Sequence, residues 1–338
     1  TSLTSVNIPS SVTVIADQTF SGCSALNELT ISGDITKIGS AAFSGCSSLT
    51  TFSIPDSVTE IGPSAFSELG ATSLSIPSGV TDGVVAALYG YTHLDGITFA
   101  EENPYQLVDG VLYKGTVLEA LLDRHVTSVE ILDGTTEIKA SAFGSTPISG
   151  SATFNACTSL TTVSIPDTVE TIGKEAFSGC SALKTADLPS GLKTIGEKAF
   201  MGTALETVVI PDGVTEIPTS VFSQVSTLKT IVIPSSVTSI GKNAFQALKN
   251  SDRGTTTTII MQGTTAPSMD QAFGVKSNVG QPPVDVTVLV PAGSEDAYKK
   301  TILKTHVTTS DSGSETTKPG ISYSLALDET ASVEAGKT

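Results

Sequence analysis

One motif returns along most of this chain at a nearly fixed interval, and it constrains the fold more than any other feature. It consists of a leucine followed by apolar residues three and five positions later, and it occupies residues 3–9, 26–31, 49–55, 160–166, 183–189, 205–211 and 228–234. A phenylalanine follows each copy, and the steps from Phe20 to Phe43 and from Phe43 to Phe66 are equal, at about 23 residues each. Repetition this strict predicts an array in which each repeat forms one coil.

The motif describes one coil with an inner and an outer side. Its apolar residues alternate with polar ones, which predicts a short strand whose leucine and isoleucine point inward. The proline that ends many copies, such as Pro55, suits a strand end because it has no N–H to donate. A single coil cannot bury its own apolar side, so the core forms between neighbours. At roughly 4.8 Å per strand, about eleven coils would extend on the order of 50 Å.

The phenylalanines test this arrangement because large aromatic side chains favour a core. Nine of the twelve fall in the Ala-Phe slot of the repeat: Phe20, Phe43, Phe66, Phe143, Phe177, Phe200, Phe222, Phe245 and Phe273. Phe52 and Phe99 take inward strand positions, and Phe154 begins a degenerate coil. The core therefore uses nearly all of the phenylalanines, and few remain for a ligand.

The period and the leucine pattern are those of leucine-rich repeats. The extended pattern, of which residues 54–66 are a near-consensus copy, resembles the BspA-like leucine-rich repeats of bacterial surface proteins. Residues 103–113 are similar to an insertion common in that family. We therefore expect a β-rich leucine-rich-repeat solenoid of about 23-residue coils. Parallel strands should line one face of a single right-handed superhelical array with an irregular insertion.

The pattern also suggests a domain organisation. We expect a solenoid over residues 1–305, with an insertion at about 83–125 and a C-terminal cap at about 256–305 that ends in a short helix. Ser294 is expected to cap that helix, with Glu295 and Asp296 in its first turn and Lys299, Lys300 and Lys304 toward its end. Between Gly144 and Cys157 we expect a shortened coil.

Residues 306–320 have the composition of a linker. Residues 321–338 are similar to the opening strands of bacterial immunoglobulin-like domains, and they are too few for a complete sandwich of about 100 residues. We therefore favour the interpretation that this segment begins a larger domain, with a stray tail as the alternative, and we expect that an upstream segment precedes residue 1.

Two groups of side chains are candidates for an interaction surface. The first group points outward from the strands and is rich in hydroxyls, as in Thr51, Ser53, Thr162, Ser164, Thr185 and Asp187. The second is a tyrosine-rich group in the predicted insertion, made of Tyr89, Tyr91, Tyr105 and Tyr113. Insertions in repeat proteins often form a binding face. The alternative is that Tyr105 and Tyr113 pack a hairpin over the edge of a coil, and that strand threonines only reflect β propensity.

The sequence predicts no catalytic, cofactor or metal site. Cys23 and Cys46 are one repeat apart, as are Cys157 and Cys180, so each pair should stack between coils. We favour buried thiols, and a disulfide in each pair stays an alternative. No zinc, phosphate-binding or nucleophile-elbow motif is present. A carboxylate pair of a carbohydrate hydrolase would have to come from distant coils, and no two acids stand out.

The net charge of the chain narrows the classes of possible partner further. The chain has 18 Lys and Arg against 34 Asp and Glu, a formal net charge of −16. This balance argues against binding to nucleic acid and to anionic membrane surfaces, and no apolar run is long enough to span a bilayer. The family resemblance implies an extracellular or cell-surface location and a protein-recognition or adhesion role toward a host or bacterial macromolecule. A structural spacer that displays other domains is the alternative function.

Overall fold

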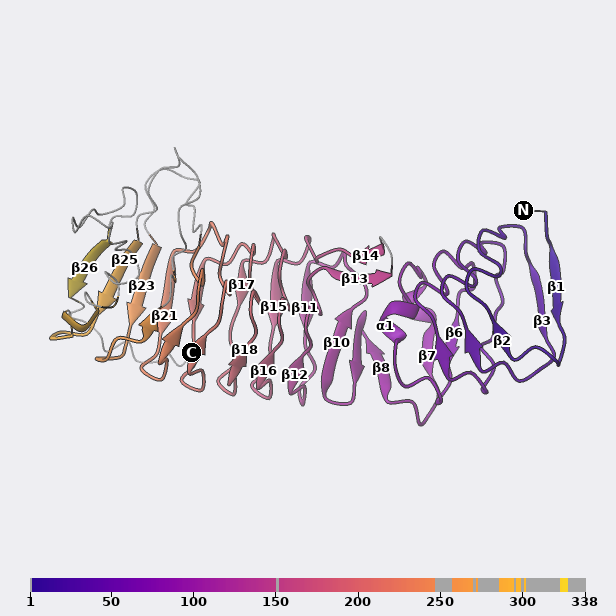
Figure 1. Ribbon diagram of the computed structural model, residues 1–338, viewed down its shortest axis with the longest axis horizontal. Helices are drawn as coiled ribbons and strands as arrows, with labels where there is room; N and C mark the ends of the chain where they lie inside the picture. The colour runs from indigo at the N-terminus through magenta and orange to yellow at the C-terminus, as the bar shows by residue number, and fades with distance from the viewer. Residues whose placement is uncertain are drawn as a thin grey trace, which may run out of the picture. The chain divides into compact units, whose positions relative to one another are not determined.

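The computed structural model describes residues 2–149, 152–246, 257–269, 272, 286–294, 296–298, 301 and 323–327. Two compact units make up the chain, and each is described by itself. Unit 1 holds Thr1–Asp123 and Thr146–Asn155, and unit 2 holds Arg124–Ser145 and Ala156–Thr338. Both consist of stacked coils with short strands (Figure 1).

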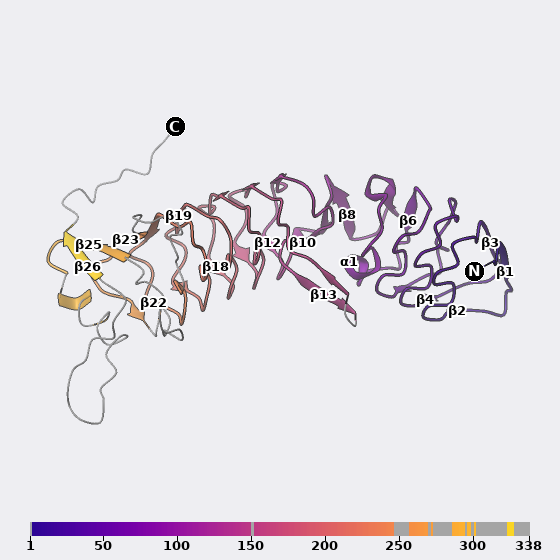
Figure 2. The same cartoon turned by 90° about the horizontal axis from the view of Figure 1, so that it is seen from above.

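The coils of unit 1 contribute short strands to two walls, although residues 49–55 follow the first wall without forming a strand. The first wall contains β1 (Ser5–Ile8), β3 (Glu28–Ile31), β6 (Leu74–Ile76) and β7 (Ile97–Phe99). The second contains β2 (Val14–Ile15), β4 (Lys37–Ile38) and β5 (Glu60–Ile61). Figure 2 shows β2 and β4 on the side away from β1 and β3. Ser5 pairs with Glu28 and Lys37 with Glu60 in parallel register, so neighbouring strands are one repeat apart, as the sequence predicted.

Unit 2 repeats the two walls. Its first wall contains β11 (Ser128–Glu130), β15 (Thr162–Ser164), β17 (Thr185–Ala186), β19 (Thr207–Val209), β21 (Thr230–Ile233), β23 (Thr257–Met261), β25 (Val286–Val290) and β26 (Tyr323–Leu327). Its second wall contains β12 (Glu137–Ile138), β16 (Thr171–Ile172), β18 (Thr194–Ile195), β20 (Glu216–Ile217), β22 (Ser239–Ile240) and β24 (Ser268–Met269). Every strand pair recorded within these walls is parallel, which confirms the expected architecture.

Phenylalanine rings form the spine of each unit's core. The rings of Phe143 and Phe177 stack with centroids 4.7 Å apart, and those of Phe177 and Phe200 stack at 5.3 Å. In unit 1, Phe20 and Phe43 stack at 5.4 Å, and half-buried Phe52 lies 4.7 Å from Phe43. The predicted Phe slot is thereby confirmed wherever it is described. Phe273 and the side chain of Phe154 lie outside the described residues.

The turn before each phenylalanine uses a left-handed residue that is not glycine. The φ angle lies between 51° and 58° at Gln18, Ala41, Ser64, Ser141, Glu175, Lys198, Ser220 and Asn243. This conformation strains any residue with a Cβ. The backbone N–H of Ala41 donates to Pro63 O at 2.9 Å, and that of Glu175 donates to Glu197 O at 2.9 Å. Hydrogen bonds to the next coil therefore hold the strained turn in place.

The predicted insertion at 83–125 is narrower in the structure. Ile97 pairs with Leu74, so residues 75–97 complete a coil of normal length. In this coil α1 (Val84–Ala87) takes the place of the usual turn. It keeps the hydrogen bonds between coils, since Ser64 N–H donates to Ala86 O and Glu68 N–H donates to Gly90 O. A short 3-10 helix η1 (Leu94–Gly96) precedes β7. The excursion is the antiparallel sheet of β8 (Tyr105–Val108), β9 (Val111–Lys114) and β10 (Val117–Leu121).

The prediction of a shortened coil between Gly144 and Cys157 is wrong. Ser128 pairs with Thr162, whereas a coil of the regular period would bring residue 151 beside it, so this coil is longer than its neighbours. The additional residues form a hairpin of β13 (Thr146–Ser149) and β14 (Ala152–Phe154). Cys157 N–H donates to Phe143 O at 2.9 Å and closes the base of the excursion.

At the C-terminal end, the described residues contain part of the predicted cap. Residues 296–298 are helical, and Tyr298 is buried with its hydroxyl donating to Gly263 O at 2.7 Å. Ser294 accepts the first helical N–H bond through its carbonyl, while its hydroxyl donates to Pro291 O rather than capping the helix. Glu295, Lys299, Lys300 and Lys304 lie outside the described residues. Strand β26 lies in the segment for which the sequence predicted the start of an immunoglobulin-like domain. It pairs in parallel with β25, and the immunoglobulin-like start stays a prediction.

Gly62 sits where neighbouring coils approach closely. A Cβ built on it would lie 2.4 Å from Ser40 N, and this contact is with backbone. We expect Gly62→Ala to lower the free energy of unfolding by about 1–3 kcal/mol through overpacking. Gly263→Ala is the comparison and should lose less, because the φ of Gly263 lies outside the left-handed region and the atom nearest its Cβ position, Ser235 Cα, is 3.3 Å away. Equal losses for both variants in denaturant melts would contradict the close-approach explanation.

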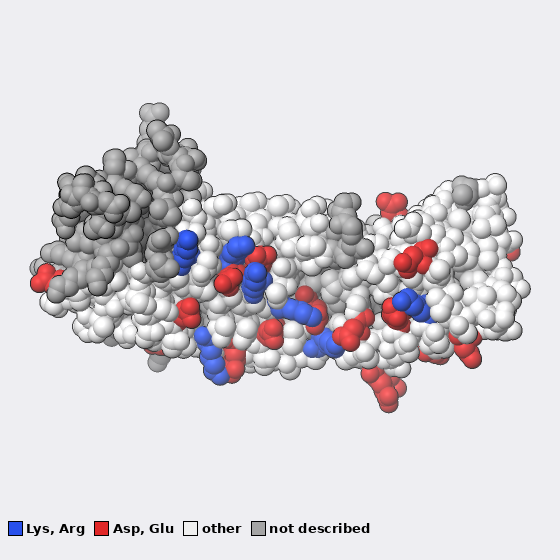
Figure 3. All heavy atoms as spheres, in the orientation of Figure 1, with Lys and Arg blue, Asp and Glu red and all other residues white. Residues whose placement is uncertain are grey.

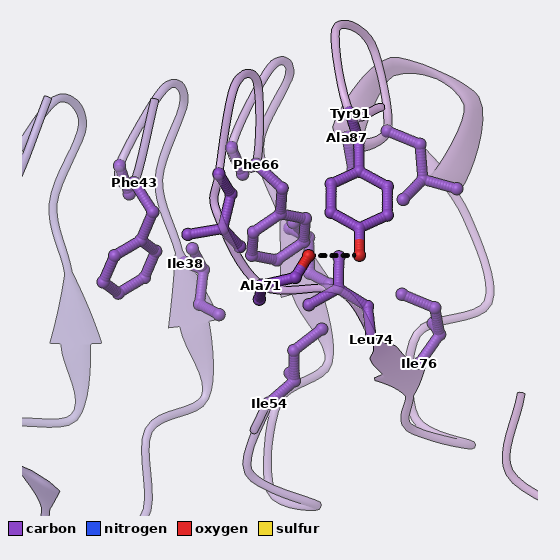
Figure 4. Close-up of a cluster of buried hydrophobic side chains, with 14 of the residues drawn as sticks. Ile38, Phe43, Ile54, Phe66, Ala71, Leu74, Ile76, Ala87 and Tyr91 are labelled. Atoms are coloured by element: carbon purple, nitrogen blue, oxygen red, sulfur yellow. Dashed lines mark hydrogen bonds between the residues drawn. The ribbon is translucent and has the colours of Figure 1, made fainter. Parts of the chain in front are cut away.

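Tyr91 tests the interior of unit 1, where it packs beside Phe66 and Leu74 (Figure 4). Its hydroxyl donates to Ala71 O at 2.8 Å. We expect Tyr91→Phe to destabilise the chain by about 1–3 kcal/mol, because the buried carbonyl loses its donor. Thr92→Val removes a neighbouring exposed hydroxyl and should change stability by less than about 0.5 kcal/mol.

Tyr298 should make stability depend on alkaline pH. Burial raises the pKa of its phenol to about 12, against about 10 in an unfolded chain. The folded state thus favours the neutral phenol, and the stabilisation is complete below pH 10 and lost as pH rises toward 12. Between pH 9 and 11.5, chemical denaturation of Tyr298→Phe should show a smaller loss of stability than the wild type. An equal loss of stability with rising pH in the wild type and in Tyr298→Phe would count against Tyr298 as the cause.

Candidate interaction surface

The outward side chains of the first wall form what we name the strand face, which contains the strand residues and the corresponding positions Thr51, Ser53 and Asp187 outside the strands. In the structure every member predicted for it is exposed or half-buried, and the six candidates Thr51, Ser53, Thr162, Ser164, Thr185 and Asp187 are all exposed. The strand geometry explains this: Val163 between Thr162 and Ser164 is 5% exposed and points into the core. The expected division between an apolar inside and a hydroxyl-rich outside is confirmed.

Parallel register turns these side chains into rows. Thr162 lies beside Ser128 on one side and beside Thr185 on the other. Thr207, Thr230 and Thr258 continue the same kind of row on β19, β21 and β23. Neighbouring hydroxyls in such a row are roughly 4.8 Å apart, so a flat partner can contact several at once. The register itself could not be read from any single repeat.

The tyrosine-rich group does not form a surface. Tyr91 and Tyr105 are each 5% exposed and Tyr113 is 1% exposed, so their rings pack inside unit 1. Burial raises the pKa of both the Tyr91 and the Tyr105 phenol. The interaction hypothesis is therefore corrected for these three residues in favour of hairpin and coil packing. Tyr89 alone is half-buried and retains accessible area.

Sequence reasoning missed a hollow of about 290 Å³ in unit 1. Leu94, Asp95, Ile97, Leu107, Asp109 and Asp123 line it. Asp109 and Gly110 both have positive φ and form the turn between β8 and β9, which brings one of the three carboxylates to the rim. Within the described residues, no group of three or more His, Cys, Asp or Glu is arranged to hold a metal ion.

The four cysteines are buried free thiols. The Cys46 thiol donates to Phe20 O at 3.2 Å, and burial, aided by the nearby Cys23, raises its pKa to about 11. A hydrogen bond with Cys157, followed by burial, raises the pKa of Cys180 well above its ordinary value. Arg124 Nη1 donates to Cys157 Sγ at 3.2 Å and to Gly144 O at 3.1 Å. Raised pKa values and burial make Cys46 and Cys180 poor nucleophiles.

Ion pairs connect successive coils. Lys37 contacts Glu60 at 2.6 Å, Lys193 contacts Glu170 at 2.7 Å, and Lys198 contacts Glu175 at 3.2 Å. In the face that Figure 3 shows, Lys and Arg lie interspersed with Asp and Glu. Such exposed pairs contribute about 0–1 kcal/mol each, and they lower the positive potential that a nucleic acid would require. In the described part of the chain, no helix has the length and apolar character needed to cross a membrane.

A search of curated proteins finds no match. Among solved structures, a leucine rich cell surface protein of Faecalibacterium prausnitzii A2-165 is 26% identical, with 82% of this chain and 83% of that chain covered and a TM-score of 0.46. A leucine-rich repeat protein of Eubacterium ventriosum is 21% identical, with 82% and 79% covered and a TM-score of 0.54, which supports the fold alone.

The repeats themselves match a known family. The BspA type leucine rich repeat region matches in six copies, over residues 1–107 and 148–263. These matches contain most of the regular coils of both units, with their leucine, isoleucine and phenylalanine positions, and the coil of β11 and β12 lies outside them. The chain belongs to the BspA-type leucine-rich repeat family.

Proposed function

We propose that this chain is a non-enzymatic protein-recognition or adhesion module that acts outside the cell, on the surface of a bacterium. The carrying observation is the strand face, where in-register rows of hydroxyl side chains stay exposed while the apolar side chains are buried. Membership of the BspA-type family, whose repeats resemble those of bacterial surface proteins, supports this role.

The chemistry of the strand face favours a protein over a sugar or a nucleic acid. Rows of serine and threonine offer many weak hydrogen bonds to a broad surface. Sugar platforms use exposed aromatic rings, whereas the face residues described above carry hydroxyls or, at Asp187, a carboxylate. The net charge of −16 repels phosphate backbones. We therefore propose a host or bacterial surface protein as the partner class.

A pair of matched double variants tests the strand face. Thr162→Glu with Thr185→Glu places two charges on neighbouring first-wall strands. Thr171→Glu with Thr194→Glu places the same charges, also one repeat apart, on the second wall. Against purified host matrix proteins and intact bacterial cells, we expect the first pair to weaken binding about tenfold or more and the second to leave it unchanged.

The other outcomes of this experiment are also informative. An equal loss of binding by both double variants, at unchanged melting temperature, would show that the strand face is not the binding surface. Absence of wild-type binding to every probe would support the alternative function, a spacer that displays other domains.

A further inference from the structure

One row of the strand face changes character along unit 2. This row, which we name the stripe, consists of Glu130, Ser164, Asp187, Val209, Val232, Ile260 and Leu289. Cα register pairs Glu130 with Ser164 on one side, and Val209 with Val232, Val232 with Ile260, and Ile260 with Leu289 on the other. Asp187 follows the paired Ala186, and a backbone bond from Glu206 N–H to Lys184 O places its coil beside that of Val209.

The second half of the stripe is aliphatic and accessible. Val209 is 57% exposed, whereas its neighbour Val208 is 2% exposed and belongs to the core. Val232, Ile260 and Leu289 are half-buried. At roughly 4.8 Å per strand these four side chains cover about 15 Å. Contiguous apolar surface of this kind on a soluble protein marks a contact site more often than isolated exposed residues do.

Unit 1 shows that the repeat does not require such a stripe. The equivalent outward row there contains Asn7, Thr30, Ser53, Ser75 and Thr98, and each of these side chains is polar and exposed. Both rows stand on the same kind of coil with the same inward pattern. The aliphatic character is therefore a property of the last coils and not a consequence of the fold.

The first half of the stripe is acidic. Glu130 and Asp187 are exposed, and Ser164 lies between them. Two lysines precede the outward threonines on β17 and β21, and both act on Glu206. Lys229 Nζ lies 2.6 Å from Glu206 Oε2, and its hydrogen bond and charge, with a smaller effect of Lys184, lower the pKa of Glu206. Glu206 thus offsets positive charge beside the stripe.

These observations favour one class of occupant. A second copy of this chain would bring another net charge of −16 to the surface, and an anionic membrane would also be repelled. A basic polypeptide is attracted by the whole chain and by the acidic end of the stripe. We propose that the stripe docks an extended segment that places aliphatic side chains over Val209, Val232, Ile260 and Leu289, and basic side chains over Asp187 and Glu130.

This inference rests on the proposed function and specifies the partner's chemistry. The seven positions of the stripe cover about 29 Å, which corresponds to about nine residues of extended chain. The probe is a twelve-residue peptide with alternating leucine and threonine in one half and alternating lysine and threonine in the other. One twin replaces each lysine by glutamate, and a second replaces each leucine by serine. Fluorescence anisotropy against the full chain at about 0.15 M salt limits unspecific attraction.

We expect the leucine–lysine peptide to bind about tenfold or more tightly than either twin. Val209→Asp should weaken its binding about tenfold or more, because it removes an apolar contact. Ser75→Asp is the matched control, since it introduces the same charge into the equivalent row of unit 1, and it should leave binding unchanged. Asp187→Lys should reverse the preference between the lysine and glutamate peptides.

Several results would overturn the inference. These are equal binding of all three peptides, no effect of Val209→Asp, or Val209-dependent binding to phosphatidylglycerol vesicles in place of peptide. Melting curves confirm that each variant folds. If no peptide binds while Thr162→Glu with Thr185→Glu still weakens binding to the host matrix proteins or bacterial cells, only the stripe is refuted. If both fail, the proposed function falls as well.

Discussion

Every coil depends on its neighbours to bury its apolar side chains and to satisfy its backbone. The stacked rings of Phe143, Phe177 and Phe200 belong to three different coils. The N–H of Phe177 donates to Ala199 O at 2.8 Å, so the same turn that carries the ring is also bonded to the next coil. Backbone groups left without partners in a buried turn would be costly. Stability is therefore a sum of contacts between adjacent coils.

This dependence separates what the core requires from what the surface can vary. Inward positions accept only apolar side chains of suitable size, because close packing leaves little space. Outward positions on the same strands have no such restriction. Asn7, Ser164, Asp187 and Val209 therefore occupy equivalent sites. Chemical specificity can thus change from coil to coil without disturbing the fold, which is the property that a recognition surface needs.

Much of the fold could be predicted because the repeat reports inward positions directly. The leucine, isoleucine and phenylalanine positions and the exposed rows all follow from the regular period. The tyrosines could not be placed in the same way, because Tyr105 and Tyr113 lie in a segment without the repeat. Their burial depends on how β8, β9 and β10 fold. The left-handed turn residues were also missed, because inter-coil hydrogen bonds allow serine or lysine where isolated turns favour glycine.

The elongated coil around β13 and β14 shows how such a scaffold can acquire new parts. The walls on either side keep their register, with Glu130 beside Ser164 and Glu137 beside Thr171, although the chain from Phe143 to Cys157 is much longer than in a regular coil. Only the short bond from Cys157 N–H to Phe143 O is needed to return the chain to its path. The register of the two walls therefore does not depend on how much chain lies between Phe143 and Cys157, and a coil of this kind can carry additional sequence at this point.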